Sequence, residues 1–131
     1  MNLRITTAWA TTALVVALGT PMLATGDSTP LIKTQLEDVE GMEVNIVNFE
    51  VGPDWATVRH IHPGHLFVYV TEGRLEVTVE GEAPQTVSAG EVFHEAPNRP
   101  MVGRTLSAEG AKFTVFQIGP AGEPLMISRP E

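Results

Sequence analysis

After residue 30, apolar and polar positions alternate over many short stretches, and no stretch keeps a helical period. Residues 75–80 alternate Leu or Val with Glu or Thr, the pattern of a strand with one face in a core and the other in water. Residues 66–70 and 111–118 have apolar residues on both faces, as expected of central strands. Turns rich in Gly and Pro separate these stretches at regular spacing, so the sequence predicts an all-β barrel or sandwich.

The N-terminal segment, residues 1–26, has a different pattern. No charged residue stands between Arg4 and Asp27, and residues 13–18 within this span are all apolar. A basic start, a short apolar centre and small residues at the end are typical of a secretory signal peptide, with cleavage expected after Ala24 or Gly26. The alternative is an uncleaved membrane anchor. The chain has no cysteine, and an exported protein without disulfides fits a bacterial periplasm better than a small eukaryotic secreted scaffold.

The charge balance is acidic, with a formal net charge of -8 for the whole chain. Residues 1–26 hold one of the 8 basic residues and none of the 16 acidic ones, so the remainder carries 7 − 16 = -9. This balance argues against nucleic acids and anionic membrane surfaces as partners. We therefore expect a soluble exported protein, periplasmic or extracellular, that meets a membrane only through its signal segment.

Two histidines one residue apart, His60 and His62, stand in a stretch that we expect to be extended. Residues two apart in a strand point to the same side, so the two imidazoles project together. Two imidazoles on one face are half of a metal site. The ordinary alternative is a hydrogen-bonded polar pair on a strand.

This order of signals resembles the cupin superfamily, small jelly-roll barrels with a metal or ligand site inside. The resemblance covers roughly residues 44–118. It predicts a single cupin-type jelly-roll β-barrel that follows the N-terminal signal segment. The motif positions that match are Gly52, His60, His62 and Gly73 in the first motif, and Gly90 and Pro97 in the second.

The chain departs from the family at two metal-ligand positions. Leu66 stands where the first motif has a glutamate, and Met101 stands where the second motif has a histidine. An alternative alignment places His94 at the histidine position, with Asn98 at the asparagine that follows it. The resemblance thus leaves two histidine ligands, with Met101 or His94 as the candidate third.

The candidate cofactor that the resemblance implies is a divalent metal: Fe, Mn, Zn, Ni or Cu. The thioether of Met101 is a soft ligand that would suit copper. We expect Leu66 to point inward and make the cavity apolar, Tyr69 to offer its hydroxyl if it is inward, and His94 to line the same mouth. The ordinary alternatives are core packing for Leu66, Tyr69 and Met101, and a place on the rim for His94.

Three functions fit these residues. The first, which we favour, is an exported single-domain cupin that binds a small molecule inside the barrel, with or without a divalent metal on His60 and His62. The second is a metal-dependent enzyme of the dioxygenase or isomerase kind, as the resemblance implies. The third is a periplasmic copper-handling protein that uses His60, His62 and Met101. The sequence does not decide whether the chain is an enzyme.

The chain divides by this interpretation into a signal peptide (residues 1–26), an N-terminal linker or arm (27–40), the barrel (41–120) and a C-terminal tail (121–131). The resemblance also implies a homodimer, because cupins commonly pair through their sheets. The candidate contact is the exposed edge strand or arm near residues 31–40.

Overall fold

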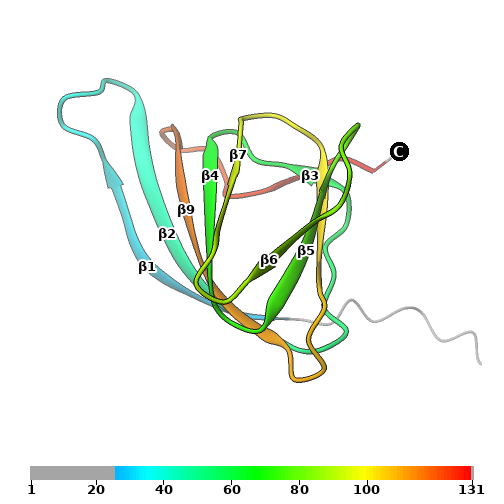
Figure 1. The fold of residues 1–131 in the computed structure, drawn as a ribbon. Coiled ribbons are helices and arrows are strands. Elements are labelled where there is room, and N and C mark those ends of the chain that lie inside the picture. The colour runs from blue at the N-terminus through cyan, green and yellow to red at the C-terminus, as the bar shows by residue number, and fades with distance from the viewer. Residues whose placement is uncertain (1–25, 131) are drawn as a thin grey trace, which may run out of the picture.

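Ten strands and the turns between them make up residues 26–130, the part of the chain that the computed structural model describes (Figure 1). The predicted signal peptide lies outside the described residues, apart from Gly26. Within residues 26–130 there is no helix that is long and apolar enough to cross a membrane.

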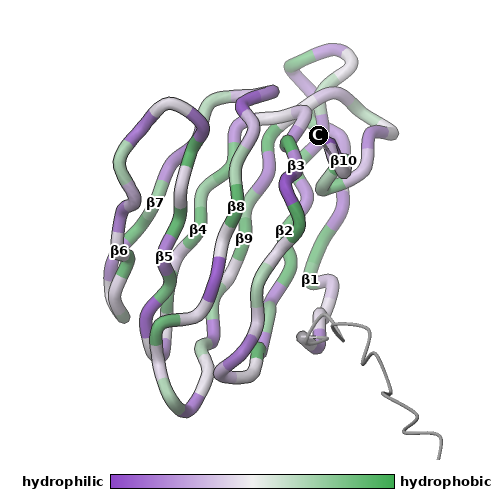
Figure 2. Tube along the Cα trace, turned by 90° about the vertical axis from the view of Figure 1, so that its right-hand side faces the viewer, coloured by the Kyte–Doolittle hydropathy of each residue, from purple (hydrophilic) through white to green (hydrophobic). Residues whose placement is uncertain are grey.

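The strands form two antiparallel sheets of five strands each. The first sheet contains, in spatial order, β1 (Asp27–Gln35), β2 (Met42–Val51), β9 (Ala111–Pro120), β4 (His65–Glu72) and β7 (Val92–Glu95). The second contains β10 (Ile127–Ser128), β3 (His60–Ile61), β8 (Met101–Thr105), β5 (Arg74–Val79) and β6 (Gln85–Ser88). After β2 the chain changes sheet at every connection except β5–β6, and Figures 1 and 2 show the two sheets facing each other. The prediction of an all-β jelly-roll is confirmed.

The core fills the space between the two sheets. Every second residue of β5 and β9 is buried, as the pleat of a strand requires. On β4 the buried residues are Leu66, Val68 and Val70, and Val70 has no exposed surface. The strands β4 and β9 lie inside the first sheet, as their apolar character on both faces predicts. Their outer face carries Phe67, Tyr69, Phe116 and Ile118 among polar residues, and it is partly exposed because no element of residues 26–130 covers it.

The segments on either side of the predicted barrel join its sheets. Residues 27–35, for which we expected a linker followed by an edge strand or arm, form β1 at the edge of the first sheet, and all nine of its residues are exposed. Part of the expected tail forms β10 at the edge of the second sheet. The barrel therefore extends beyond residues 41–120 at both ends.

The turn between β3 and β4 depends on Gly64. A Cβ atom at this position would collide with the backbone carbonyl of Ile118 on β9. Only glycine lets this turn pack so closely against β9, and the turn connects the histidine pair directly to β4.

Candidate functional site

The side chains of His60 and His62 point into the barrel together, as their spacing predicts. They are 2% and 6% exposed. Their rings are nearly perpendicular, with an interplanar angle of 87°, and the two Nε2 atoms are 3.1 Å apart. The backbone N–H of Asn98 donates to the carbonyl of His62 and ties the loop between β7 and β8 to the pair.

Backbone carbonyls hold the other nitrogen of each ring. His60 Nδ1 lies 2.8 Å from the Val58 oxygen, and His62 Nδ1 lies 2.6 Å from the Leu125 oxygen. A carbonyl only accepts hydrogen bonds, so we assign the hydrogen of each neutral ring to Nδ1. Each Nε2 is then an unprotonated acceptor, and in this tautomer no hydrogen lies between the two Nε2 atoms. Metal-binding histidines are commonly oriented through their second nitrogen in this way.

Burial keeps both rings neutral. It lowers the pKa of His60, against a smaller rise from the hydrogen bond to Val58. It lowers the pKa of His62 to about 4, a shift that the hydrogen bond to Leu125 only partly offsets. A proton shared between the rings is therefore disfavoured at neutral pH. The gap between the Nε2 atoms instead suits a metal cation or a hydrogen-bond donor on a ligand.

The histidine pair opens onto a cavity of about 350 Å³ between the two sheets, lined almost entirely by apolar side chains. Leu66 and Met101 both line it and are 2% and 5% exposed. Met101 is the direct β8 partner of His60 in the second sheet, so its thioether belongs to the same neighbourhood. Leu66 stands where the first cupin motif has a glutamate, so an apolar side chain replaces a carboxylate and the cavity stays apolar.

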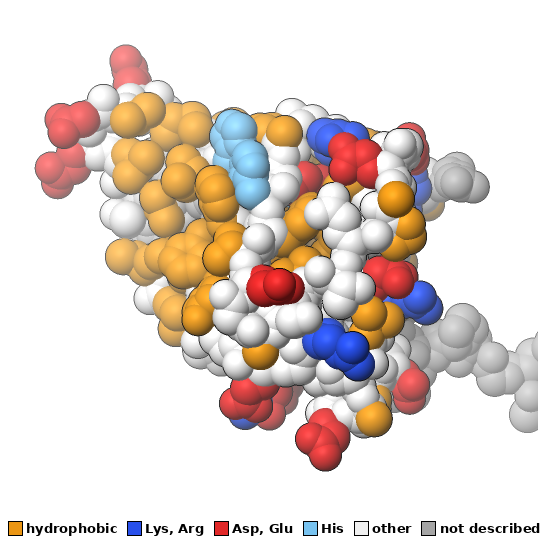
Figure 3. Space-filling model, viewed as in Figure 1, with side chains coloured by type: hydrophobic (Ala, Val, Ile, Leu, Met, Phe, Trp, Pro, Cys, Tyr) orange, Lys and Arg blue, Asp and Glu red, His pale blue; other side chains and the backbone are white. Residues whose placement is uncertain are grey.

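Two predicted ligand-binding residues lie elsewhere. Strand β7 buries Phe93 and Glu95, which turns His94 outward, and Tyr69 is 40% exposed on the outer face of β4. His94 Nε2 lies 3.2 Å from His65 Nδ1, and both residues are exposed. Figure 3 shows a histidine surface beside an apolar patch. The expectation that His94 and Tyr69 line the cavity was wrong, because strand parity places them on the opposite side of the sheet from Leu66.

Sequence reasoning missed two buried polar side chains, Gln117 and Glu95. They are the β9 and β7 partners of Leu66, so the three side chains form one row on the inner face of the first sheet. Each is 3% exposed, and Gln117 Oε1 and both Glu95 oxygens have no hydrogen-bond partner within residues 26–130. The sequence feature that could have revealed them is a polar residue at an inward position of a strand whose other inward residues are apolar.

Glu95 has an unusual charge environment. Burial raises the pKa of its carboxyl group to about 7, Arg99 opposes this rise and Glu82 adds to it. Arg99 is itself paired with Glu82 rather than with Glu95.

Within residues 26–130, no three His, Cys, Asp or Glu side chains lie close enough together to hold a metal ion. A third ligand supplied to the histidine pair by residues 26–130 would therefore be of another residue type.

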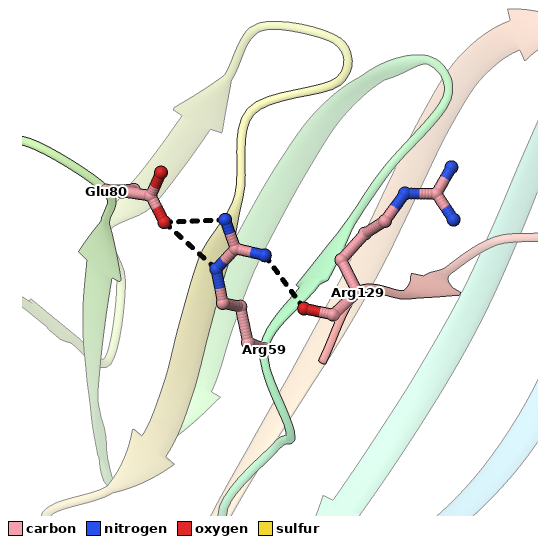
Figure 4. A network of polar contacts seen from close by, with 3 residues as sticks. All are labelled: Arg59, Glu80 and Arg129. Carbon is pink, nitrogen blue, oxygen red and sulfur yellow. Dashed lines mark hydrogen bonds and ion pairs between the residues drawn. The ribbon is translucent and has the colours of Figure 1, made fainter. Parts of the chain in front are cut away.

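Arg59 makes hydrogen bonds that connect the chain segments around the histidine pair. Its guanidinium donates to Glu80 Oε2 at 2.9 and 2.7 Å and to the Arg129 carbonyl at 2.8 Å (Figure 4). These bonds link the start of β3 to the end of β5 and to the tail. The tail also carries the Leu125 carbonyl that orients His62, so Arg59 helps to hold the segment that fixes the ring.

Comparisons with known structures find the same fold at low sequence identity. A Klebsiella pneumoniae protein with a double-stranded β-helix domain is 15% identical, with a TM-score of 0.65, over 86% of this chain and 90% of that one. An RmlC-like cupin family protein from Methanocaldococcus jannaschii is 14% identical, with a TM-score of 0.61, over 82% and 94%. The DMSP lyase DddQ from Ruegeria pomeroyi is 15% identical, with a TM-score of 0.62, over 86% of this chain and 55% of that one.

None of the curated proteins compared with the chain matches it. The family model described as a cupin domain matches residues 47–116, which contain both histidines, Leu66 and Met101. This match spans more than half of the sequence and agrees with the two facing sheets and with the structural neighbours. The chain therefore belongs to the cupin family.

Proposed function

We propose that this cupin binds a small, mostly apolar molecule inside its barrel, anchored by a metal cation held at the Nε2 atoms of His60 and His62. The observation that carries the proposal is the 3.1 Å separation of two nitrogens whose hydrogens are engaged elsewhere. The apolar cavity of about 350 Å³ beside them has room for the rest of a small ligand.

The residues present fit a metal that keeps open positions. Two neutral imidazoles are typical ligands of first-row divalent metals, and their Nδ1 atoms are already held by carbonyls. When bound, such a metal supplies a Lewis acid that polarises an oxygen or nitrogen atom of the ligand. Leu66 and the apolar walls exclude water from the cavity and favour the hydrocarbon part of the ligand.

The test is a metal titration of the purified chain with Zn(II), Fe(II), Mn(II) and Cu(I), followed by calorimetry. We expect one metal per chain, and loss of binding in a His60→Ala, His62→Ala double variant. The matched control is a His65→Ala, His94→Ala double variant, which removes the same number of imidazoles from the outer face and should keep the interior metal. A wild-type chain that binds none of these metals would contradict the metal anchor.

One observation favours copper handling as a second candidate function. Met101 is the cross-strand partner of His60, is buried and lines the same cavity. Two imidazoles and a thioether are ligands that suit copper. In this case Met101→Leu, which keeps the volume, lowers the affinity for Cu(I) and leaves the affinity for Zn(II) unchanged.

We further propose, from the pattern of residues 1–26, that the chain is exported, and that it forms a homodimer through β1. Leu31 and Ile32 on this edge strand are 55% and 47% exposed. An exposed edge strand can pair with a second copy of itself. A Leu31→Glu, Ile32→Glu variant should then have the solution mass of a monomer, and an unchanged mass relative to wild type would exclude this contact.

A further inference from the structure

Two consecutive carbonyls of the tail hold Gln117 and His62. Gln117 Nε2 donates to the Pro124 oxygen at 3.3 Å, and His62 Nδ1 donates to the Leu125 oxygen at 2.6 Å. The amide nitrogen must be the atom that faces Pro124, because an amide oxygen cannot donate to a carbonyl. The orientation of the Gln117 amide is therefore fixed, and its oxygen is the free end.

Gln117 is a neighbour of the histidine pair. Its amide lies within hydrogen-bonding reach of the His62 ring, and this contact opposes, in small part, the burial that lowers the pKa of that ring. It also lies beside Leu66 in the row of inward side chains on β9 and β4. The amide oxygen is thus placed on the inner face of the first sheet, in the neighbourhood of the position where the family has a carboxylate.

The free oxygen of Gln117 has no donor within residues 26–130, although the residue is only 3% exposed. Leaving a buried acceptor unpaired costs about 1–3 kcal/mol. The two Nε2 atoms of the histidine pair are acceptors as well. With both ring hydrogens on Nδ1, residues 26–130 thus place three acceptor atoms in this neighbourhood without a donor for them, an arrangement that suits a cation.

We propose that Gln117 Oε1 is the third protein ligand of the cation held by His60 and His62. This inference rests on the proposed function and makes it more specific. Two imidazole nitrogens and one amide oxygen form a ligand set of borderline and hard character, which favours Zn²⁺, Ni²⁺, Cu²⁺ or Fe²⁺ over Cu⁺. The carbonyls of residues 124 and 125 then act as outer groups that orient two of the three ligands.

The test compares Zn(II) affinity, measured by calorimetry, across variants at one position. Gln117→Leu has a similar volume without the oxygen, and we expect binding weaker by roughly tenfold or more. Gln117→Glu keeps the shape and adds a charge, and we expect tighter binding than wild type. Gln85→Glu, at an exposed position of strand β6, adds the same charge away from the site and should bind as wild type does.

Thermal unfolding without metal establishes that each variant is folded. Equal Zn(II) affinity in wild type, Gln117→Leu and Gln117→Glu would overturn the role of Gln117. The proposed function would survive this result if the His60→Ala, His62→Ala variant still lost the metal. Absence of Zn(II) binding in both wild type and Gln117→Glu would overturn the inference together with the zinc form of the anchor.

Discussion

The carboxyl group of Glu95 offers a quantitative test of how strongly the barrel interior destabilises a charged side chain. Its side chain is 3% exposed, and neither oxygen has a hydrogen-bond partner within residues 26–130. Burial raises its pKa from 4.5 to about 7, because the charged form is poorly solvated there. Replacement by glutamine keeps the shape of the protonated acid and removes the charge.

The sign of the pH dependence follows from this raised pKa. Between pH 4.5 and about 7, the folded chain binds the Glu95 proton more tightly than the unfolded chain. The stabilising contribution of this group is therefore complete below pH 4.5 and is lost as the pH rises through about 7. At 1.36 kcal/mol per pKa unit the full loss is about 3 kcal/mol. We expect Glu95→Gln to be more stable than wild type by about this amount at pH 8, and by much less at pH 5.

The assay is urea unfolding of wild type and Glu95→Gln at several pH values between 5 and 8. The lowered pKa values of His60 and His62 act in the opposite direction but are common to both proteins, so they cancel in the difference. Glu109→Gln, which removes an exposed carboxyl group, is the control for the change in net charge. A stability difference that stays constant with pH, or a wild type that is more stable at pH 8, would show that burial does not raise the pKa of Glu95.

Three further predictions concern the interior site and its supports. Leu66→Glu returns a carboxylate to the family's position, so it should lower the melting temperature of the metal-free chain and raise its affinity for Zn(II) in calorimetry. Gly64→Ala should destabilise the chain by about 1–3 kcal/mol in urea unfolding, because the new Cβ meets the Ile118 carbonyl. A chain shortened to residue 123 loses the Leu125 carbonyl that orients His62, so it should stay folded by circular dichroism and bind Zn(II) more weakly. A variant with the stability and Zn(II) affinity of wild type would contradict the structural reason given for that variant.

The local pattern of the sequence was enough for the fold and for the histidine pair. Alternation over residues 75–80 predicts β5, and apolar character on both faces predicts β4 and β9 inside a sheet. The two-residue spacing of His60 and His62 places both rings on one side, because parity within a single strand needs no knowledge of its partners. The edge strand β1 was less clear, because a strand exposed at all its positions has no buried face to set a pattern.

The rest of the site depends on information that single-strand patterns do not contain. In β4 apolar residues occupy both faces, so no alternation distinguishes the side of Leu66 from that of Tyr69. The short strand β7 gives equally little guidance for His94. The row of Gln117, Leu66 and Glu95 exists only because β9 and β7 pair with β4 in one register, which is set by the whole fold.

The tautomeric state of His60 and His62 shows directly whether the pair offers two free Nε2 atoms to a cation. It can be measured by ¹⁵N NMR of the histidine rings in the metal-free chain at neutral pH. We predict that both rings are neutral, with hydrogen on Nδ1 and none on Nε2, and that both Nε2 signals shift when Zn(II) is added. A hydrogen on Nε2 of either ring, or Nε2 signals that do not respond to the metal, would contradict this prediction.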